Sequence, residues 1–161
     1  MRAYIYEGLW FDIGGMNKYL EANWGFLEEY WRRGEIRSPA NAQINFGAKV
    51  QPPTLIGEGT KVEEDAVLGP MAIVGENATI RGLAEIQGSV IMKDVLVDGE
   101  AKIVDSVVAR GSSIGRRVVI ERGTAVGEWV EIDDDLTIGE GAKICPGKHV
   151  TRPVEKGEIV L

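Results

Sequence analysis

The sequence contains a single cysteine, Cys145, and a single histidine, His149, in 161 residues. One cysteine excludes a disulfide bond within the chain and is typical of a reducing compartment. No apolar run approaches the roughly 18 residues that a membrane-spanning helix needs. The first residues also lack the apolar stretch of a signal peptide. We therefore expect a cytoplasmic protein with no membrane partner.

Positive charge is also scarce, with 18 lysines and arginines against 25 acidic residues and a net charge of −7. A phosphate backbone attracts basic surfaces, so we expect no nucleic-acid partner. The hydrophobic fraction of 44% and the charged fraction of 27% are typical of a globular protein. Glycine is abundant, at 21 residues, and this excess needs a structural reason.

Residues 16–33 have the periodicity of a helix. Gly34 is suited to end it, because glycine readily adopts the left-handed conformation found there. Gly25 inside the segment costs about 1 kcal/mol of helix stability relative to alanine. A polar connection follows, from Gly34 to Asn41. The large side chains recur at steps of three and four and should share one face: Met16, Tyr19, Leu20, Trp24, Leu27, Tyr30 and Trp31.

From residue 42 onward the period changes to six. Aliphatic residues recur at every sixth position from Ile44 to Ile86 and again from Ile114 to Val150. The two runs come into register if one residue is deleted in each of two repeats between them, which gives 19 repeat positions. The residue two places before each aliphatic position is nearly always small. Such a period predicts a solenoid of short parallel strands, with three hexapeptides per coil and about six coils stacked at roughly 4.8 Å.

One outward face of this solenoid is predicted to be apolar along its length, whereas the other two carry charged residues. An exposed apolar face of this extent usually marks an interface. Three partners could cover it: the aromatic face of the preceding helix, another copy of the chain, or a further domain. We predict interface positions at Leu55, Ile73, Val90, Met92, Val107 and Ala125.

Residues 8–24, Gly-Leu-Trp-Phe-Asp-Ile-Gly-Gly-Met-Asn-Lys-Tyr-Leu-Glu-Ala-Asn-Trp, resemble the G-x-W-x-D-[IV]-G-[ST]-x-x-x-Y segment of sugar-1-phosphate nucleotidylyltransferases. That segment ends their catalytic domain, and a helix and a left-handed hexapeptide β-helix follow it in many members. The resemblance is greatest to mannose-1-phosphate guanylyltransferases and glucose-1-phosphate thymidylyltransferases. It implies that residues 1–35 are the end of the catalytic domain plus a linker helix, and that residues 36–161 form a left-handed β-helix.

The resemblance carries one chemical residue across. Asp12 matches the family aspartate that helps to hold the Mg²⁺ ion between the nucleotide and sugar phosphates. A single carboxylate is a poor site for a hard cation, which prefers several oxygen ligands. The glycine-rich phosphate loop and the catalytic lysine segment of the family have no counterpart here, so we expect no catalytic residue in this chain. Mg²⁺ is expected for the full-length enzyme only. Gly15 departs from the family pattern, which has Thr or Ser there.

Two other activities occur on this fold. A hexapeptide acyltransferase would use acyl-coenzyme A with a histidine base, and His149 is the only candidate for that role. A γ-carbonic-anhydrase-like enzyme is excluded because its zinc ion needs three histidines. The acidic run Glu131, Asp133, Asp134 and Asp135 is more typical of a solvated turn than of a Ca²⁺ site.

The sequence therefore predicts the assembly or regulatory domain of a nucleotide-sugar pyrophosphorylase, the enzyme that joins a nucleoside triphosphate to a sugar 1-phosphate and releases pyrophosphate. Its expected partners are the catalytic domain of the parent enzyme and further copies of itself, in a trimer or dimer. The alternative function is acyl transfer through His149.

Overall fold

The helix expected over residues 16–33 is present as α1 (Met16–Arg32) in the computed structural model, which describes residues 8–161. Gly34 ends it with a positive φ of 70°, and its amide donates a hydrogen bond to the Trp31 carbonyl at 2.9 Å. Leu20 and Leu27 are buried as the periodicity predicts, whereas Tyr30 and Trp31 remain half exposed. Among the described residues there is no helix with the length and apolar character that crossing a membrane would require.

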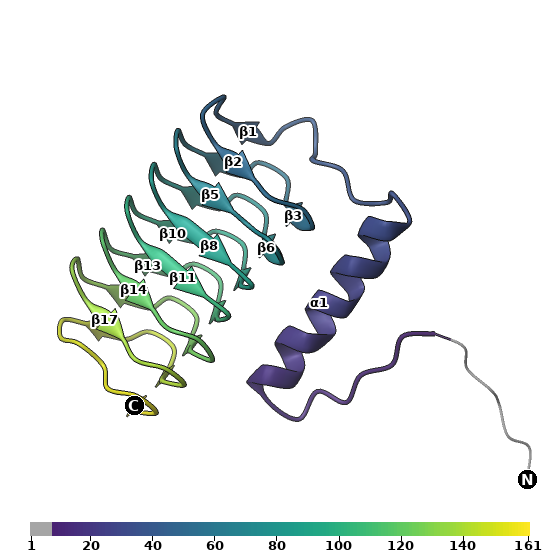
Figure 1. The fold of residues 1–161 in the computed structure, drawn as a ribbon. Coiled ribbons are helices and arrows are strands. Elements are labelled where there is room, and N and C mark those ends of the chain that lie inside the picture. The colour runs from purple at the N-terminus through teal and green to yellow at the C-terminus, as the bar shows by residue number, and fades with distance from the viewer. Residues whose placement is uncertain (1–7) are drawn as a thin grey trace, which may run out of the picture.

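The rest of the chain winds into a three-sided stack of parallel strands (Figure 1). Sheet A comprises β1 (Gln43–Ile44), β4 (Lys61–Val62), β7 (Thr79–Ile80), β10 (Leu96–Val97), β13 (Ser113–Ile114), β16 (Glu131–Ile132) and β19 (His149–Val150). Sheet B comprises β2 (Lys49–Val50), β5 (Val67–Leu68), β8 (Glu85–Gln87), β11 (Lys102–Val104), β14 (Val119–Ile120) and β17 (Thr137–Ile138). Sheet C comprises β3 (Thr54–Ile56), β6 (Ala72–Val74), β9 (Val90–Ile91), β12 (Val107–Val108), β15 (Ala125–Val126), β18 (Lys143–Ile144) and β20 (Ile159–Val160).

The predicted fold class, a left-handed parallel β-helix preceded by one helix, is confirmed. The stack is one coil longer than the sequence count, with about seven coils rather than six. The count stopped at Val150, but the chain continues through a single parallel bridge between Ile138 and Val154 and then through β20. The step of four residues from Val150 to Val154 breaks the period of six, which is why the pattern did not show these rungs.

The core of the β-helix consists of the aliphatic residues of the repeat and the small residues two places before them. Ile103 and Ile120 are fully buried, as are Ala84 and Ala101. A single rung has no room to bury its own aliphatic side chain, so each coil depends on the coils above and below it. The buried hydroxyl groups of the described residues are all hydrogen-bonded; for example, Thr60 Oγ1 donates to the Gly75 carbonyl at 2.8 Å.

Two consecutive coils are one residue short at the same edge of the prism, between sheets B and C. The strand register there advances by 17 residues, from Ile73 to Val90 and from Val90 to Val107, instead of the usual 18. Gly88 and Asp105 make these tighter corners with positive φ values of 57° and 44°. We call this pair of positions the shortened corners. The structure confirms both predicted deletions.

Within residues 8–161, no further coil lies below the first coil. The inward-facing Ile44 and Val50 are consequently exposed, and Phe46, in the turn that follows β1, is fully exposed. These three residues define the first-coil surface. Strands β1, β2 and β3 are edge strands in the three sheets, each paired on one side only, and such edges are able to pair with another chain.

Candidate functional site

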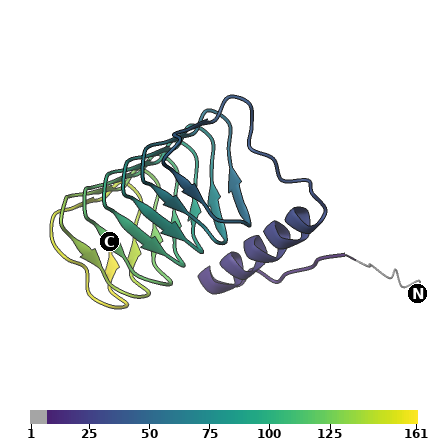
Figure 2. The same ribbon diagram turned by 45° about the horizontal axis from the view of Figure 1, so that its top comes forward.

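Helix α1 lies along sheet C and covers the middle of the apolar face (Figure 2). Leu20 packs with Val90 and Val107, and all three side chains are buried. Half-buried residues surround this contact from both elements: Met16, Tyr19, Trp24, Ile73 and Met92. The apolar residues of this face are thus explained by their packing against α1.

Trp24 fixes the position of α1 along the β-helix. Its indole Nε1 donates a hydrogen bond to the Gly88 carbonyl at 3.0 Å, at the first of the shortened corners. A Cβ atom on Gly88 would lie 2.0 Å from Asp105 Oδ1 and 3.5 Å from the Trp24 ring. Gly88 therefore lets the two short coils stack closely and lets the indole approach the backbone.

Five of the six predicted interface residues form one column on sheet C, as their pairing shows, and Met92 directly follows β9. Val90 and Val107 lie beneath α1. Leu55, near the C-terminal end of the helix, remains exposed, and Ala125 is half buried. Of the three coverings that the sequence left open, the helix is the one present in this chain. A contact with a second copy or another domain stays a prediction.

Helix α1 carries a second apolar surface beside its contact with sheet C, where Phe26 and Tyr30 line a hollow with Leu55 and Ile73. Phe11, from the segment ahead of the helix, packs against Phe26 with ring centroids 5.5 Å apart, and Tyr30 continues the row at 6.4 Å from Phe26. A Cβ atom on Gly25 would lie 2.6 Å from the Phe11 ring. The glycine that weakens the helix thus makes room for Phe11. Phe26, Tyr30 and Trp31 are exposed, and we call them the outer aromatic row.

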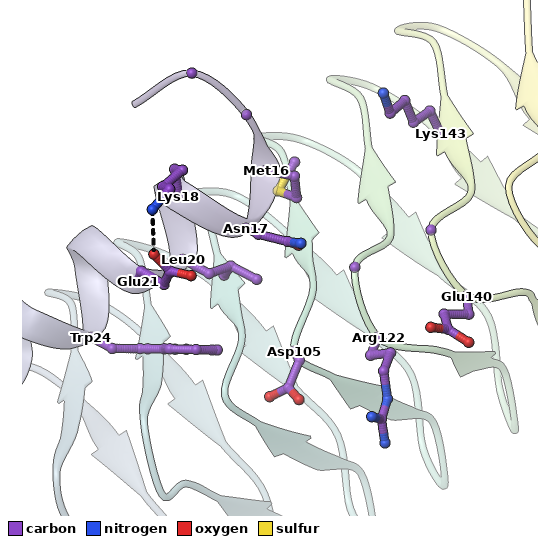
Figure 3. Close-up of a pocket in the computed structure, with 14 residues that line it drawn as sticks. Met16, Asn17, Lys18, Leu20, Glu21, Trp24, Asp105, Arg122, Glu140 and Lys143 are labelled. Atoms are coloured by element: carbon purple, nitrogen blue, oxygen red, sulfur yellow. Dashed lines mark ion pairs between the residues drawn. The ribbon is translucent and has the colours of Figure 1, made fainter. Parts of the chain in front are cut away.

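A groove of about 600 Å³ opens where the N-terminal end of α1 meets the later coils (Figure 3). Arg122, Glu140 and Lys143 reach it from the β-helix, and Lys18 and Glu21 reach it from α1, where they form an ion pair at 3.3 Å. Glycine at position 15 provides no side-chain hydrogen bond to the first turn. The charges in the groove are of both signs, so it concentrates neither a cation nor an anion.

Asp12, the predicted metal residue, is exposed in the segment ahead of α1 and does not line this groove. Among residues 8–161 there is no cluster of three or more potential metal ligands that includes it. The residues around Asp12 therefore do not fit a Mg²⁺ ion by themselves.

His149, the candidate acyltransferase base, lies in β19, directly beside β16. Its Nε2 is 2.7 Å from Asp133 Oδ1, and this hydrogen bond raises the pKa of the imidazole above its usual value. Glu131 is its partner in the strand register and, with Asp133, borders a hollow of about 460 Å³. The 18-residue spacing from 131 to 149 was the sequence signal that could have predicted this pair.

The remaining members of the acidic run have other partners. The Arg117 guanidinium holds Asp135 at 2.7 Å and lowers the pKa of that carboxyl group. Asp134 Oδ1 accepts a hydrogen bond from the Arg116 amide at 2.8 Å. The four acidic residues thus do not converge on one cation. Cys145, outside this run, is half buried.

Residues 40–160 match a protein family described as the GMPPB C-terminal domain. A comparison with curated proteins finds no match. Among solved structures, a Bacillus cereus protein with a provisional acetyltransferase assignment is 21% identical, with a TM-score of 0.54 and 75% of each chain covered. WeeI from Acinetobacter baumannii is 18% identical with a TM-score of 0.52, covering 87% of this chain and 62% of WeeI. At these identities the two structures share the fold alone.

Proposed function

Because this chain belongs to the family of the GMPPB C-terminal domain, we propose that it is the assembly and regulatory domain of a nucleotide-sugar pyrophosphorylase. The parent enzyme would join a nucleoside triphosphate to a sugar 1-phosphate and release pyrophosphate. The chemistry and its Mg²⁺ ion would belong to a catalytic domain, and the present residues would hold that domain and join copies of the enzyme. A cytoplasmic location fits the single cysteine.

The first-coil surface is the observation that carries the assembly role. A solenoid needs its terminal core covered, and here Ile44, Val50 and Phe46 are exposed. An identical surface on a second copy satisfies this need, because two such ends meet about a two-fold axis with the same residues on both sides. Strand edges in the first coil would pair across the same contact. The proposed assembly is therefore a dimer.

The outer aromatic row is the proposed docking surface for the catalytic domain. The row adjoins the segment that precedes α1, because Phe26 packs against Phe11 of that segment. In the family that the sequence resembles, this segment closes the catalytic domain. Tyr30 and Trp31 combine an apolar body with a polar tip, and such side chains are common in protein contacts. Because α1 also packs on sheet C, it would hold the catalytic domain in a fixed position relative to the β-helix.

Phe46→Glu tests the dimer. We expect light scattering to give twice the 17.5 kDa chain mass for the wild type and the single chain mass for Phe46→Glu, because the charge would be buried at the centre of the contact. Phe46 is fully exposed in the single chain, so the fold should survive. The control is Leu83→Glu, another exposed apolar residue, which should remain dimeric. A monomeric wild type, or a dimeric Phe46→Glu variant, would contradict the assembly role.

The second candidate is acyl transfer with His149 as base, and the His149–Asp133 hydrogen bond is the observation in its favour. The charge of the neighbouring hollow opposes it. Within the described residues the hollow is lined by Asp98, Glu131, Asp133 and Asp134 and by no lysine or arginine. Coenzyme A carries several phosphate charges, which these carboxylates would repel.

Calorimetry with acetyl-coenzyme A separates the two candidates. We expect no binding below about 1 mM, which corresponds to roughly 4 kcal/mol. Tighter binding that His149→Ala abolishes would favour acyl transfer over the proposed role.

A further inference from the structure

Adjacent rungs of sheet A bring the only histidine of the chain next to two carboxylates. Glu131 in β16 pairs in register with His149 in β19, and Asp133 lies two residues beyond Glu131. Side chains alternate along a strand, so Glu131 and Asp133 point outward on either side of the inward Ile132. The backbone here is held by the bonds from Glu131 N to Lys148 O at 2.8 Å and from Asp133 N to Val150 O at 3.0 Å.

The three side chains are close enough to hold one ion. One potential ligand atom from each lies within 4.8 Å of the other two, and His149 Nε2 is 2.7 Å from Asp133 Oδ1. Two ligands on one zinc ion are at most about 4.4 Å apart, twice a bond of about 2.2 Å. Small rotations of the exposed side chains therefore bring all three into contact with a common ion.

The charge pattern of the neighbouring rungs distinguishes this cluster from several outward carboxylates of the β-helix. Those carboxylates pair with a basic side chain on an adjacent coil, as in Arg81–Asp98 at 3.0 Å, Lys102–Glu85 at 3.1 Å and Arg110–Glu128 at 3.1 Å. At Glu131 the position on the next coil is His149. Within residues 8–161 no lysine or arginine forms an ion pair with Glu131 or Asp133. Glu131 and Asp133 thus lack the lysine or arginine partner that Asp98, Glu85 and Glu128 have.

The hollow beside the cluster leaves room for water on the ion. Ser113 in the neighbouring strand β13 has a small side chain and Gly115 after it has none, and the space above them measures about 460 Å³. Asp98, across the hollow, is already paired with Arg81. Three protein ligands with adjoining open space are the arrangement of a metal site that keeps free coordination positions.

We propose that Glu131, Asp133 and His149 form a binding site for a divalent transition-metal ion of the zinc class. An imidazole nitrogen with two carboxylate oxygens suits Zn²⁺ and its neighbours in the transition series, whereas Mg²⁺ and Ca²⁺ prefer ligand sets made of oxygen alone. The two negative charges balance the charge of the ion. The site is independent of the proposed assembly role, because it lies on sheet A near the last coils, away from the first-coil surface and from α1 (Figure 1).

Titration calorimetry with zinc chloride on the whole chain at neutral pH tests the site. We expect one zinc ion per chain, with an affinity that falls at least about tenfold in His149→Ala; a loss of that size follows even when a residue that only supports a metal ligand is removed. Glu131→Gln should weaken zinc binding by a comparable factor. Mg²⁺ should bind more weakly than Zn²⁺ to the wild type.

Two control variants keep the result specific. Cys145→Ser removes the only thiol, and Glu128→Gln removes a carboxylate that is paired with Arg110; both should bind zinc as the wild type does. All the substituted ligands are at least partly exposed, so circular dichroism should show an unchanged fold. Zinc should also shift the ring resonances of His149, the only histidine signals in the spectrum. Equal zinc affinity in the wild type and His149→Ala, or loss of binding in Cys145→Ser, would overturn the proposal.

Discussion

Replacing Val90 and Val107 together by glutamate should detach α1 from the β-helix while the coils remain folded. Both side chains are buried against Leu20, so docking of the helix would force two carboxylates into an apolar contact. A buried charge without a partner costs about 3–5 kcal/mol, and each 1.4 kcal/mol is about a factor of ten in an equilibrium constant. Hydrogen exchange of the α1 amides should accelerate by roughly 100-fold or more.

The matched control for this prediction is Val67→Glu together with Val119→Glu. These valines occupy the same outward strand positions, but on sheet B, away from the helix. They should leave exchange in α1 unchanged. Unchanged hydrogen exchange in α1 of the Val90→Glu/Val107→Glu variant would contradict this prediction. In that case the Trp24 hydrogen bond to Gly88, and not the packing of Leu20, would hold the helix on the β-helix.

Ile103→Ala should be among the most damaging single truncations of the β-helix. Ile103 is 0% exposed in β11, between coils on both sides, whereas Ile44 is 37% exposed at the same repeat position in the first coil. A buried isoleucine cut to alanine loses about 2–5 kcal/mol of the free energy of unfolding. Ile44→Ala should lose roughly 1 kcal/mol or less, because much of its side chain is already in water.

Urea unfolding followed by circular dichroism measures both variants of this pair. The comparison holds chemistry and repeat position constant and changes only the coverage of the residue. Equal losses at the two positions would mean that the first coil is covered in solution, as it would be in a dimer. The pair should therefore be measured at a protein concentration low enough for the single chain to prevail.

The repeat made most of the fold predictable from the sequence. A residue such as Ile120 faces inward for the same reason as every sixth residue around it, so one rule assigns the whole column. The two deletions were predictable because the small residue, here Ser89 and Ser106, keeps its place before the aliphatic one. Gly34 likewise ended the helix as its conformational preference predicts.

What the sequence did not predict depends on side-chain contacts between distant segments. Trp24 and Gly88 are 64 residues apart, and no period links a helix to a corner of the β-helix. The half-exposed state of Tyr30 and Trp31 follows from where α1 sits, and their spacing alone could not provide it. The Glu131–His149 pair is an intermediate case, because extending the 18-residue offset across sheet A would have placed these two side chains together.

The shortened corners set the point along the β-helix at which α1 attaches. Trp24 donates its hydrogen bond to Gly88, at the first of the shortened corners. The position of α1 along the β-helix therefore depends on which coil is one residue short. Complete coils gained or lost after this point would lengthen or shorten the rod without moving the helix. A deletion shifted by one coil would instead slide the helix by one rung, about 4.8 Å. The length of the β-helix and the position of α1 along it can thus change independently.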